Sequence, residues 1–168
     1  MPMTSFKKVY EAFYNKMEED SSFFNYFDLN EKQAMALAAE RAHTYLVEAI
    51  AIIELKKEVD ETADFYDYDD EILAFNWDLS KVEINLLACL MYEQEYKRQY
   101  SKLKAFEMQH IPSTLQVFSP ANERKTVKAL IEDIHAENMT MLDDYLSKDR
   151  ATRKFKTLEY DSLSEDDN

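Results

Sequence analysis

The chain contains no glycine in its 168 residues, where average usage of about 7% would give roughly a dozen. Glycine is the residue that reaches positive φ without a steric cost and lets a backbone approach a ligand closely. Phosphate-binding loops, dinucleotide fingerprints and nucleophile elbows all need it. The sequence therefore disfavours nucleotide-binding enzymes and hairpins closed by glycine turns. Abundant Glu, Lys, Leu, Ala and Met favour helices instead.

Acidic residues outnumber basic ones, with 34 Asp and Glu against 20 Lys and Arg and a formal net charge of −14. Such a surface repels nucleic acid and anionic membranes. The N-terminus lacks the apolar core of a signal peptide, and no run of about 18 apolar residues predicts a membrane span. The lone cysteine, Cys89, lies in an apolar run, so we expect a buried, inert thiol in a reducing compartment. We expect one soluble domain inside a cell.

Four segments repeat apolar residues every three or four positions, which is the spacing of an amphipathic helix: residues 5–20, 30–57, 80–106 and 119–147. Asn30 with Gln33, and Ser80 with Glu83, have the spacing of capping boxes. Pro120 after a serine is typical of a helix start. The sequence predicts an all-α, four-helix bundle-like domain over residues 1–147.

The expected inward faces of the last three helices follow from the same spacing. The second helix has Met35, Ala39, Ala42, Leu46, Ile50 and Ile53. The third has Val82, Leu86, Cys89 or Leu90, Tyr96, Tyr100 and Leu103. The fourth has Val127, Leu130, Ile131, Ile134, Met141, Leu142 and Tyr145.

Residues 58–79 form an expected acidic loop insertion, with seven acids and no base between Asp60 and Glu71. Charge repulsion disfavours a helix there, and a short strand fits around residues 72–75. A calcium loop needs a glycine that is absent. We therefore expect a solvated, exposed acidic rim. Its candidate residues are Asp60, Glu61, Asp64, Asp67, Asp69 and Asp70.

Residues 148–168 are expected to form an extended C-terminal arm. Its first part is basic, and apolar side chains follow at short intervals, as in segments that insert into a partner. A solvated, frayed terminus is the alternative interpretation. The candidate docking residues are Arg150, Arg153, Lys154, Phe155, Lys156, Leu158 and Tyr160.

Two Glu-x-x-His pairs, Glu40/His43 and Glu132/His135, have the spacing that di-metal bundles use, with Glu11 and Glu93 or Glu95 as further candidate ligands. At about 100° per residue, however, each Glu of a pair lies about 120–130° from the apolar stripe of its helix, toward solvent. No Ser or Cys has an evident histidine partner. We expect no enzyme, no metal and no cofactor.

Three stretches resemble a known family: Phe75-Asn76-Trp77-Asp78-Leu79, the segment from Glu83 to Met91 with Glu93, and Phe118-Ser119-Pro120-Ala121-Asn122-Glu123. The pattern is similar to that of small acidic head–tail connector proteins, or neck adaptors, of tailed phages of Gram-positive bacteria. The resemblance covers residues 75–146. Trp77 and Pro120 depart from the pattern.

The resemblance implies a virion structural protein that is made in the host cytoplasm and assembles as a ring, of twelve copies in the family, below the portal protein. It implies contacts with the portal and with other neck and tail proteins, while DNA passes through unbound. An acidic channel wall would keep DNA from sticking. The alternative is an acidic DNA mimic that inhibits a host nucleic-acid-binding protein, although solubility alone would also spread acids over the helix exteriors.

Overall fold

The computed structural model describes residues 3–17, 30–57, 63–110 and 120–156. Four helices dominate these residues: α1 (Phe6–Met17), α2 (Glu31–Lys56), α3 (Lys81–His110) and α4 (Pro120–Leu146). Three two-residue strands, β1 (Thr4–Ser5), β2 (Tyr68–Asp69) and β3 (Ala74–Phe75), form one small sheet. The prediction of an all-α, bundle-like fold is confirmed.

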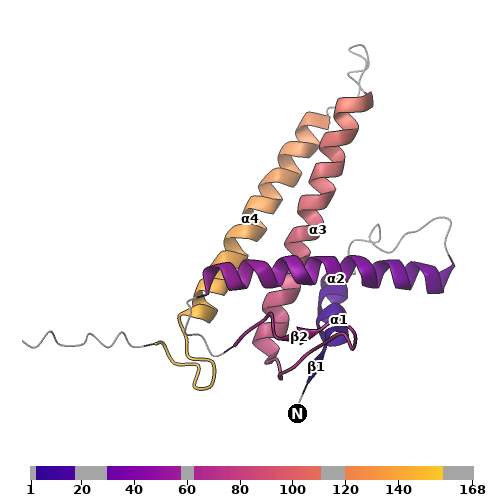
Figure 1. The fold of residues 1–168 in the computed structure, drawn as a ribbon. Helices are drawn as coiled ribbons and strands as arrows, with labels where there is room; N and C mark the ends of the chain where they lie inside the picture. The colour runs from indigo at the N-terminus through magenta and orange to yellow at the C-terminus, as the bar shows by residue number, and fades with distance from the viewer. Residues whose placement is uncertain (1–2, 18–29, 58–62, 111–119, 157–168) are drawn as a thin grey trace, which may run out of the picture.

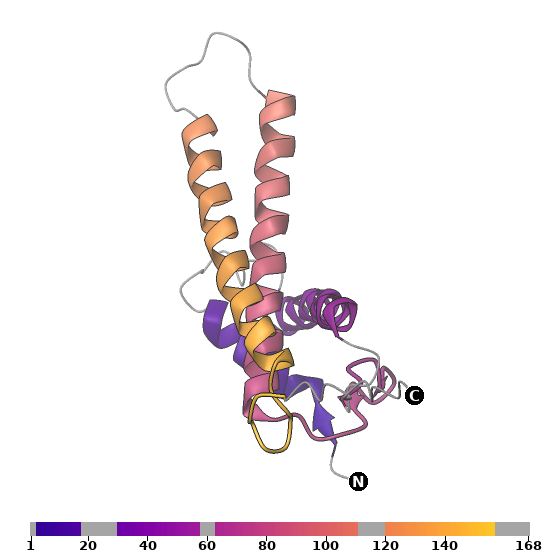
Figure 2. The same ribbon diagram turned by 90° about the vertical axis from the view of Figure 1, so that its left-hand side faces the viewer.

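Helix α3 is the centre of the molecule, because α1, α2 and α4 each pack against it. Helices α3 and α4 form a long antiparallel hairpin, and α2 crosses α3 at a steep angle instead of running alongside it (Figures 1 and 2). The first half of α3 is therefore enclosed on several sides. Its buried apolar residues are Leu86, Leu87, Ala88, Leu90 and Met91.

Both predicted capping boxes are present. The side chain of Asn30 accepts from the Gln33 amide at 3.0 Å, and the Gln33 side chain accepts from the Asn30 amide at 3.2 Å. Ser80 Oγ accepts from the Glu83 amide at 3.3 Å, and Glu83 Oε2 accepts from the Ser80 amide at 2.6 Å. These bonds satisfy amides that have no partner within the helix. Helix α4 starts at Pro120, as predicted, whereas α3 continues to His110, beyond its predicted end.

The small sheet joins the N-terminus to the acidic segment. Its strand order is β1-β3-β2, with Thr4 and Tyr68 both paired to Phe75. The strand expected around residues 72–75 is present at Ala74–Phe75, whereas β1 was not predicted. Thr4 is fully buried, and its hydroxyl donates to Asp78 and accepts from the Leu79 amide, both at 2.9 Å. Leu73, at φ 52°, makes the left-handed turn before β3 that glycine would usually make.

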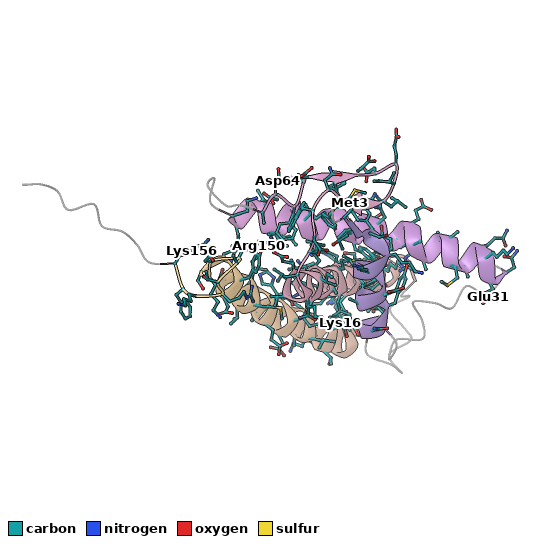
Figure 3. All side chains as sticks on the ribbon, turned by 90° about the horizontal axis from the view of Figure 1, so that it is seen from below. Met3, Lys16, Glu31, Asp64, Arg150 and Lys156 are labelled. Atoms are coloured by element: carbon teal, nitrogen blue, oxygen red, sulfur yellow. The ribbon has the colours of Figure 1, made fainter. Side chains whose placement is uncertain are left out.

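Four expectations about burial are wrong. Met35, Val82 and Leu130 are 57%, 37% and 43% exposed, although their spacing predicted inward positions. Cys89 is only half-buried. Helical spacing identifies the face that packs, but it does not tell how far along that face a neighbour extends. The start of α2, at Glu31, projects past the other helices (Figure 3), and the distal part of the α3–α4 hairpin projects past α2 (Figure 1).

Candidate functional site

The C-terminal residues of the described chain fold back on themselves directly after α4. Residues 148–156, here called the cationic turn, close through an antiparallel bridge between Lys148 and Phe155. The Asp149 amide donates to the Lys154 carbonyl at 2.8 Å, and Asp149 Oδ1 accepts from the amide and hydroxyl of Thr152, each at 2.7 Å. The expectation of an arm that extends from residue 148 is therefore wrong for residues 148–156, because local hydrogen bonds close this segment into a turn.

Arg150 fixes the cationic turn to the start of α3. Its Nε donates to Glu83 Oε1 at 2.6 Å and its Nη2 to Glu83 Oε2 at 3.1 Å. The same guanidinium donates to the Asp78 carbonyl at 2.7 Å and lies over the Trp77 ring, 4.6 Å from its centroid. Figure 3 shows Arg150 directed toward the body of the molecule. We expected Arg150 to dock a partner, but its charge and planar face are used within the chain.

Glu83 is fully buried, and its surroundings keep it ionised. Burial by itself raises the pKa of this carboxyl, but hydrogen bonds from Arg150, Ser80 and Tyr145 outweigh that effect and lower the pKa below its ordinary value. The Tyr145 hydroxyl donates to Oε1 at 2.7 Å. The neighbouring carboxylate in turn raises the pKa of Arg150. The pair therefore stays charged over a wide pH range.

The remaining described members of the predicted docking set lie together on the outer surface of the cationic turn. Arg153, Lys154, Phe155 and Lys156 are exposed, and Phe155 is 70% exposed. The Lys148 ammonium lies 5.1 Å from the centroid of the Phe155 ring. A large aromatic side chain surrounded by cations can bind an acidic protein surface that carries an apolar pocket.

Comparisons with protein-family models, curated proteins and solved structures found no match. The kind of partner that the cationic turn can bind is therefore inferred from its own side chains. Leu158 and Tyr160, the last two predicted docking residues, lie outside the described residues.

The predicted acidic rim corresponds to a folded turn, residues 64–73, here called the acidic turn. Asp64, Asp67 and Asp70 are exposed, and Asp69 is half-buried. Their oxygens also hold the backbone in place: Asp69 Oδ1 accepts from the Ile72 amide at 3.3 Å, and Asp67 Oδ1 accepts from the Asn76 side chain at 2.7 Å. The structure brings these four acids together; Asp60 and Glu61 lie outside the described residues.

The residues weighed as metal ligands lie apart. His43 faces Tyr10, 3.1 Å from its hydroxyl, whereas His135 contacts Glu93 at 2.8 Å. Glu132 is exposed and pairs with Lys128 on its own helix. The described residues hold no group of three or more His, Cys, Asp or Glu side chains that could bind a metal ion.

Sequence reasoning missed the role of α3 as a carrier of buried carboxylates. Glu93 is fully buried, and it accepts from Asn138 at 2.8 Å and pairs with Lys97 at 2.6 Å. Burial raises the pKa of Glu93, but hydrogen bonds from Lys97, Asn138 and His135 outweigh it and lower the pKa. Glu95, also buried, accepts from Arg41 at 3.0 Å and from the Tyr45 hydroxyl.

Each buried carboxylate of α3 connects that helix to a different neighbour. Glu83 reaches the cationic turn, Glu93 reaches α4 and Glu95 reaches α2. A buried charge is costly unless it is paired, so these contacts favour one arrangement of the helices over its alternatives. In the sequence, the capping box drew attention to Glu83, whereas Glu93 and Glu95 were weighed only as candidate metal ligands and Glu93 as part of the resemblance. None of the described helices is long and apolar enough to cross a membrane.

Proposed function

We propose that this chain is a structural subunit of the head–tail connector of a tailed bacteriophage. In this proposal it joins other copies in a ring below the portal protein, surrounds the DNA channel in the virion neck and carries out no chemistry. The observation that carries the proposal is the cationic turn, an exposed aromatic and basic element that Arg150 fixes to the central helix.

Rigid attachment matters for a docking element because ordering a flexible segment costs binding free energy. Phe155 lies on a turn that is closed by its own hydrogen bonds and fixed to α3 by Arg150. Its side chain is therefore presented to a partner with little conformational entropy left to lose. Basic residues on both sides of it suit an acidic surface of the portal or of a neighbouring neck protein.

The residues that carry the family resemblance occupy structurally important positions, which also supports the proposal. Phe75 and Leu79 are core residues, and Glu83 and Glu93 are two of the buried carboxylates of α3. A family that shares these residues would share the carboxylates through which α3 contacts Arg150 and α4 in this protein. The net charge of −14 that each copy carries would then repel DNA from the channel wall.

The alternative, a DNA mimic, is less well supported. A mimic needs carboxylates spaced along one continuous surface. The distal part of the α3–α4 hairpin instead carries the exposed bases Lys102, Lys104 and Lys125. These charges would repel the basic groove that a mimic has to enter.

The test measures the mass of the purified full chain, alone and with the portal ring of the same phage, by light scattering and negative-stain imaging. We expect added mass on one face of the portal ring. The variant Lys154→Glu/Phe155→Ala should weaken this binding at least about tenfold, because aromatic anchors and complementary charges dominate such interfaces.

The matched control is Lys32→Glu/Met35→Ala, which changes one exposed lysine and one exposed apolar residue in the first turns of α2. This end of α2, at Glu31, lies on the opposite side of the molecule from Lys156 (Figure 3). Equal loss of portal binding in both variants, or no binding by the unmodified chain, would overturn the proposal. Circular dichroism checks that both variants keep their helices.

A further inference from the structure

The charge of this acidic protein is distributed very unevenly along its length. Between Lys97 and Ile131 the sequence has seven Lys and Arg residues and two acids, a net of +5, which leaves −19 for the rest of a chain whose total is −14. These residues include the distal part of the α3–α4 hairpin, which projects past α1 and α2 (Figures 1 and 2). The fold therefore separates a basic end from an acidic remainder.

Four lysines of the α3–α4 hairpin lie on one face. The contact between Glu93 of α3 and His135 of α4 shows which sides of the two helices form this face. Lys97 pairs with Glu93 at 2.6 Å, and Lys104 follows Glu93 by 11 residues, close to three helical turns. On α4, Lys128 precedes His135 by seven residues, close to two turns. His135 contacts Glu93 at 2.8 Å, so both helices present these lysines on the same side.

The fourth member of this lysine face is Lys125, three residues before Lys128 and so on the same side of α4. Lys97 and Lys128 are 44% and 61% exposed. Lys104 and Lys125 are also exposed. Lys97 and Lys128 each pair with a glutamate of their own helix, but all four lysines are exposed, and such a basic face suits a negatively charged partner.

The acidic turn has the complementary composition. Asp64, Asp67, Asp70 and Glu71 are exposed there. The same turn exposes large apolar side chains: Tyr66 and Ile72 are each 53% exposed and Leu73 is 45% exposed. Exposed apolar side chains gathered in one short segment are typical of a contact surface. The aliphatic stems of lysines can cover such side chains while their ammonium groups meet the carboxylates.

The two surfaces cannot meet within one molecule. The acidic turn lies beside the start of α3, and Lys104 is 23 residues along that helix from Lys81, a separation of about 35 Å along the axis. Figure 1 shows the strands at one end of the molecule and the hairpin end at the other. Contact between the two surfaces therefore needs two molecules.

We propose that the lysine face of one copy binds the acidic turn of a second copy. The two surfaces differ, so the contact is head-to-tail, and such contacts give closed rings or open chains. This inference deepens the proposed function by naming the interface between subunits. The contact itself is argued from the two surfaces, and only its closure into a ring rests on the proposed function. DNA is the less favoured occupant, because the remaining −19 of the chain repels phosphate whereas the acidic turn also offers apolar contacts.

The experiment uses sedimentation velocity of the full chain with two charge-reversal variants, Lys104→Glu/Lys125→Glu and Asp70→Lys/Glu71→Lys. Each variant keeps one intact surface, so each alone should be monomeric. Mixed in equal amounts, they should form a heterodimer that grows no further, because one interface can form and the next cannot. The unmodified chain should form larger assemblies, whose association constant falls at least about tenfold between about 50 mM and about 500 mM salt.

The matched controls are Lys8→Glu/Lys32→Glu and Glu31→Lys/Glu40→Lys, which make the same charge changes at exposed positions elsewhere. The controls should assemble like the unmodified chain. A monomeric unmodified chain, a mixture without heterodimer, or loss of assembly in the controls would overturn the inference. Gel retardation of duplex DNA by the lysine face of a monomeric chain would also overturn the inference.

Portal binding is measured separately with the same proteins. Self-assembly without portal binding would leave this inference standing and overturn the proposed function. Portal binding by a chain that never self-assembles would leave the proposed function standing and overturn this inference.

Discussion

Arg150 and Glu83 are 67 residues apart in the sequence and form a bidentate ion pair, with 2.6 Å between Nε and Oε1 and 3.1 Å between Nη2 and Oε2. The carboxylate is fully buried, whereas the Arg150 side chain is 35% exposed. Glu83 is also the second residue of the α3 capping box. The carboxylate of Glu83 therefore caps α3 and also holds the cationic turn, which follows α4.

Replacing Arg150 by alanine should lower the free energy of unfolding by about 2–3 kcal/mol, because it leaves a buried carboxylate without its cation. Urea denaturation followed by circular dichroism measures this change. The exposed neighbour provides the matched control, since Arg153→Ala should change stability by less than about 0.5 kcal/mol.

A double variant separates the charge from the packing of the pair. Glu83→Gln/Arg150→Met removes both charges while it keeps similar volumes, so it should be at least about 1 kcal/mol more stable than Arg150→Ala. Equal losses in the single and double variants would show that contacts with Trp77, and not the charge of Glu83, account for the effect of Arg150.

Stability should fall in acid because the pKa values of Glu83 and Glu93 are lowered in the folded protein from an ordinary value of 4.5. In the unfolded chain these carboxyls bind protons at higher pH than in the folded one. Their contribution is therefore fully present above about pH 5 and is lost as the pH falls through the folded pKa values. The urea midpoint should drop from pH 5 to pH 3, with a smaller drop in Glu83→Gln/Arg150→Met.

The helices of this protein could be predicted because their signals are local. A capping box joins residues three positions apart, as in Asn30 and Gln33, and a stripe such as Phe6, Val9 and Phe13 extends over two turns. Both depend on the backbone geometry of one helix. The acidic segment was recognised for the same reason, since a run of like charges disfavours a helix wherever it occurs.

The contacts between elements could not be predicted, because they join residues distant in the sequence. Nothing near Arg150 indicates that it turns toward Glu83, and nothing near Thr4 indicates that it pairs with Phe75. The lysine face escaped notice because its members come from two helices that first meet in the folded hairpin. The resemblance to phage connectors stays a prediction.

Cys89 should react with a thiol reagent in the folded protein. Its half-buried side chain lines a groove of about 350 Å³ together with Tyr92 and Asn138. Access through this groove needs no global unfolding, so the labelling rate should not change with low concentrations of urea. Cys89→Ser gives the blank. A labelling rate that follows the population of unfolded chain would instead support the buried thiol expected from the sequence.

Replacing Asn138 by leucine should loosen α4 from α3 and lower the free energy of unfolding by about 1–3 kcal/mol. Asn138 is 4% exposed, and its side-chain amide donates to Glu93 Oε2 at 2.8 Å and to the Cys89 carbonyl at 3.1 Å. Leucine has a similar volume but leaves both buried acceptors short of a donor. Urea denaturation measures the loss, and the exposed neighbour Glu137→Leu is the control. Unchanged stability in Asn138→Leu would mean that Lys97 and His135 satisfy Glu93 by themselves.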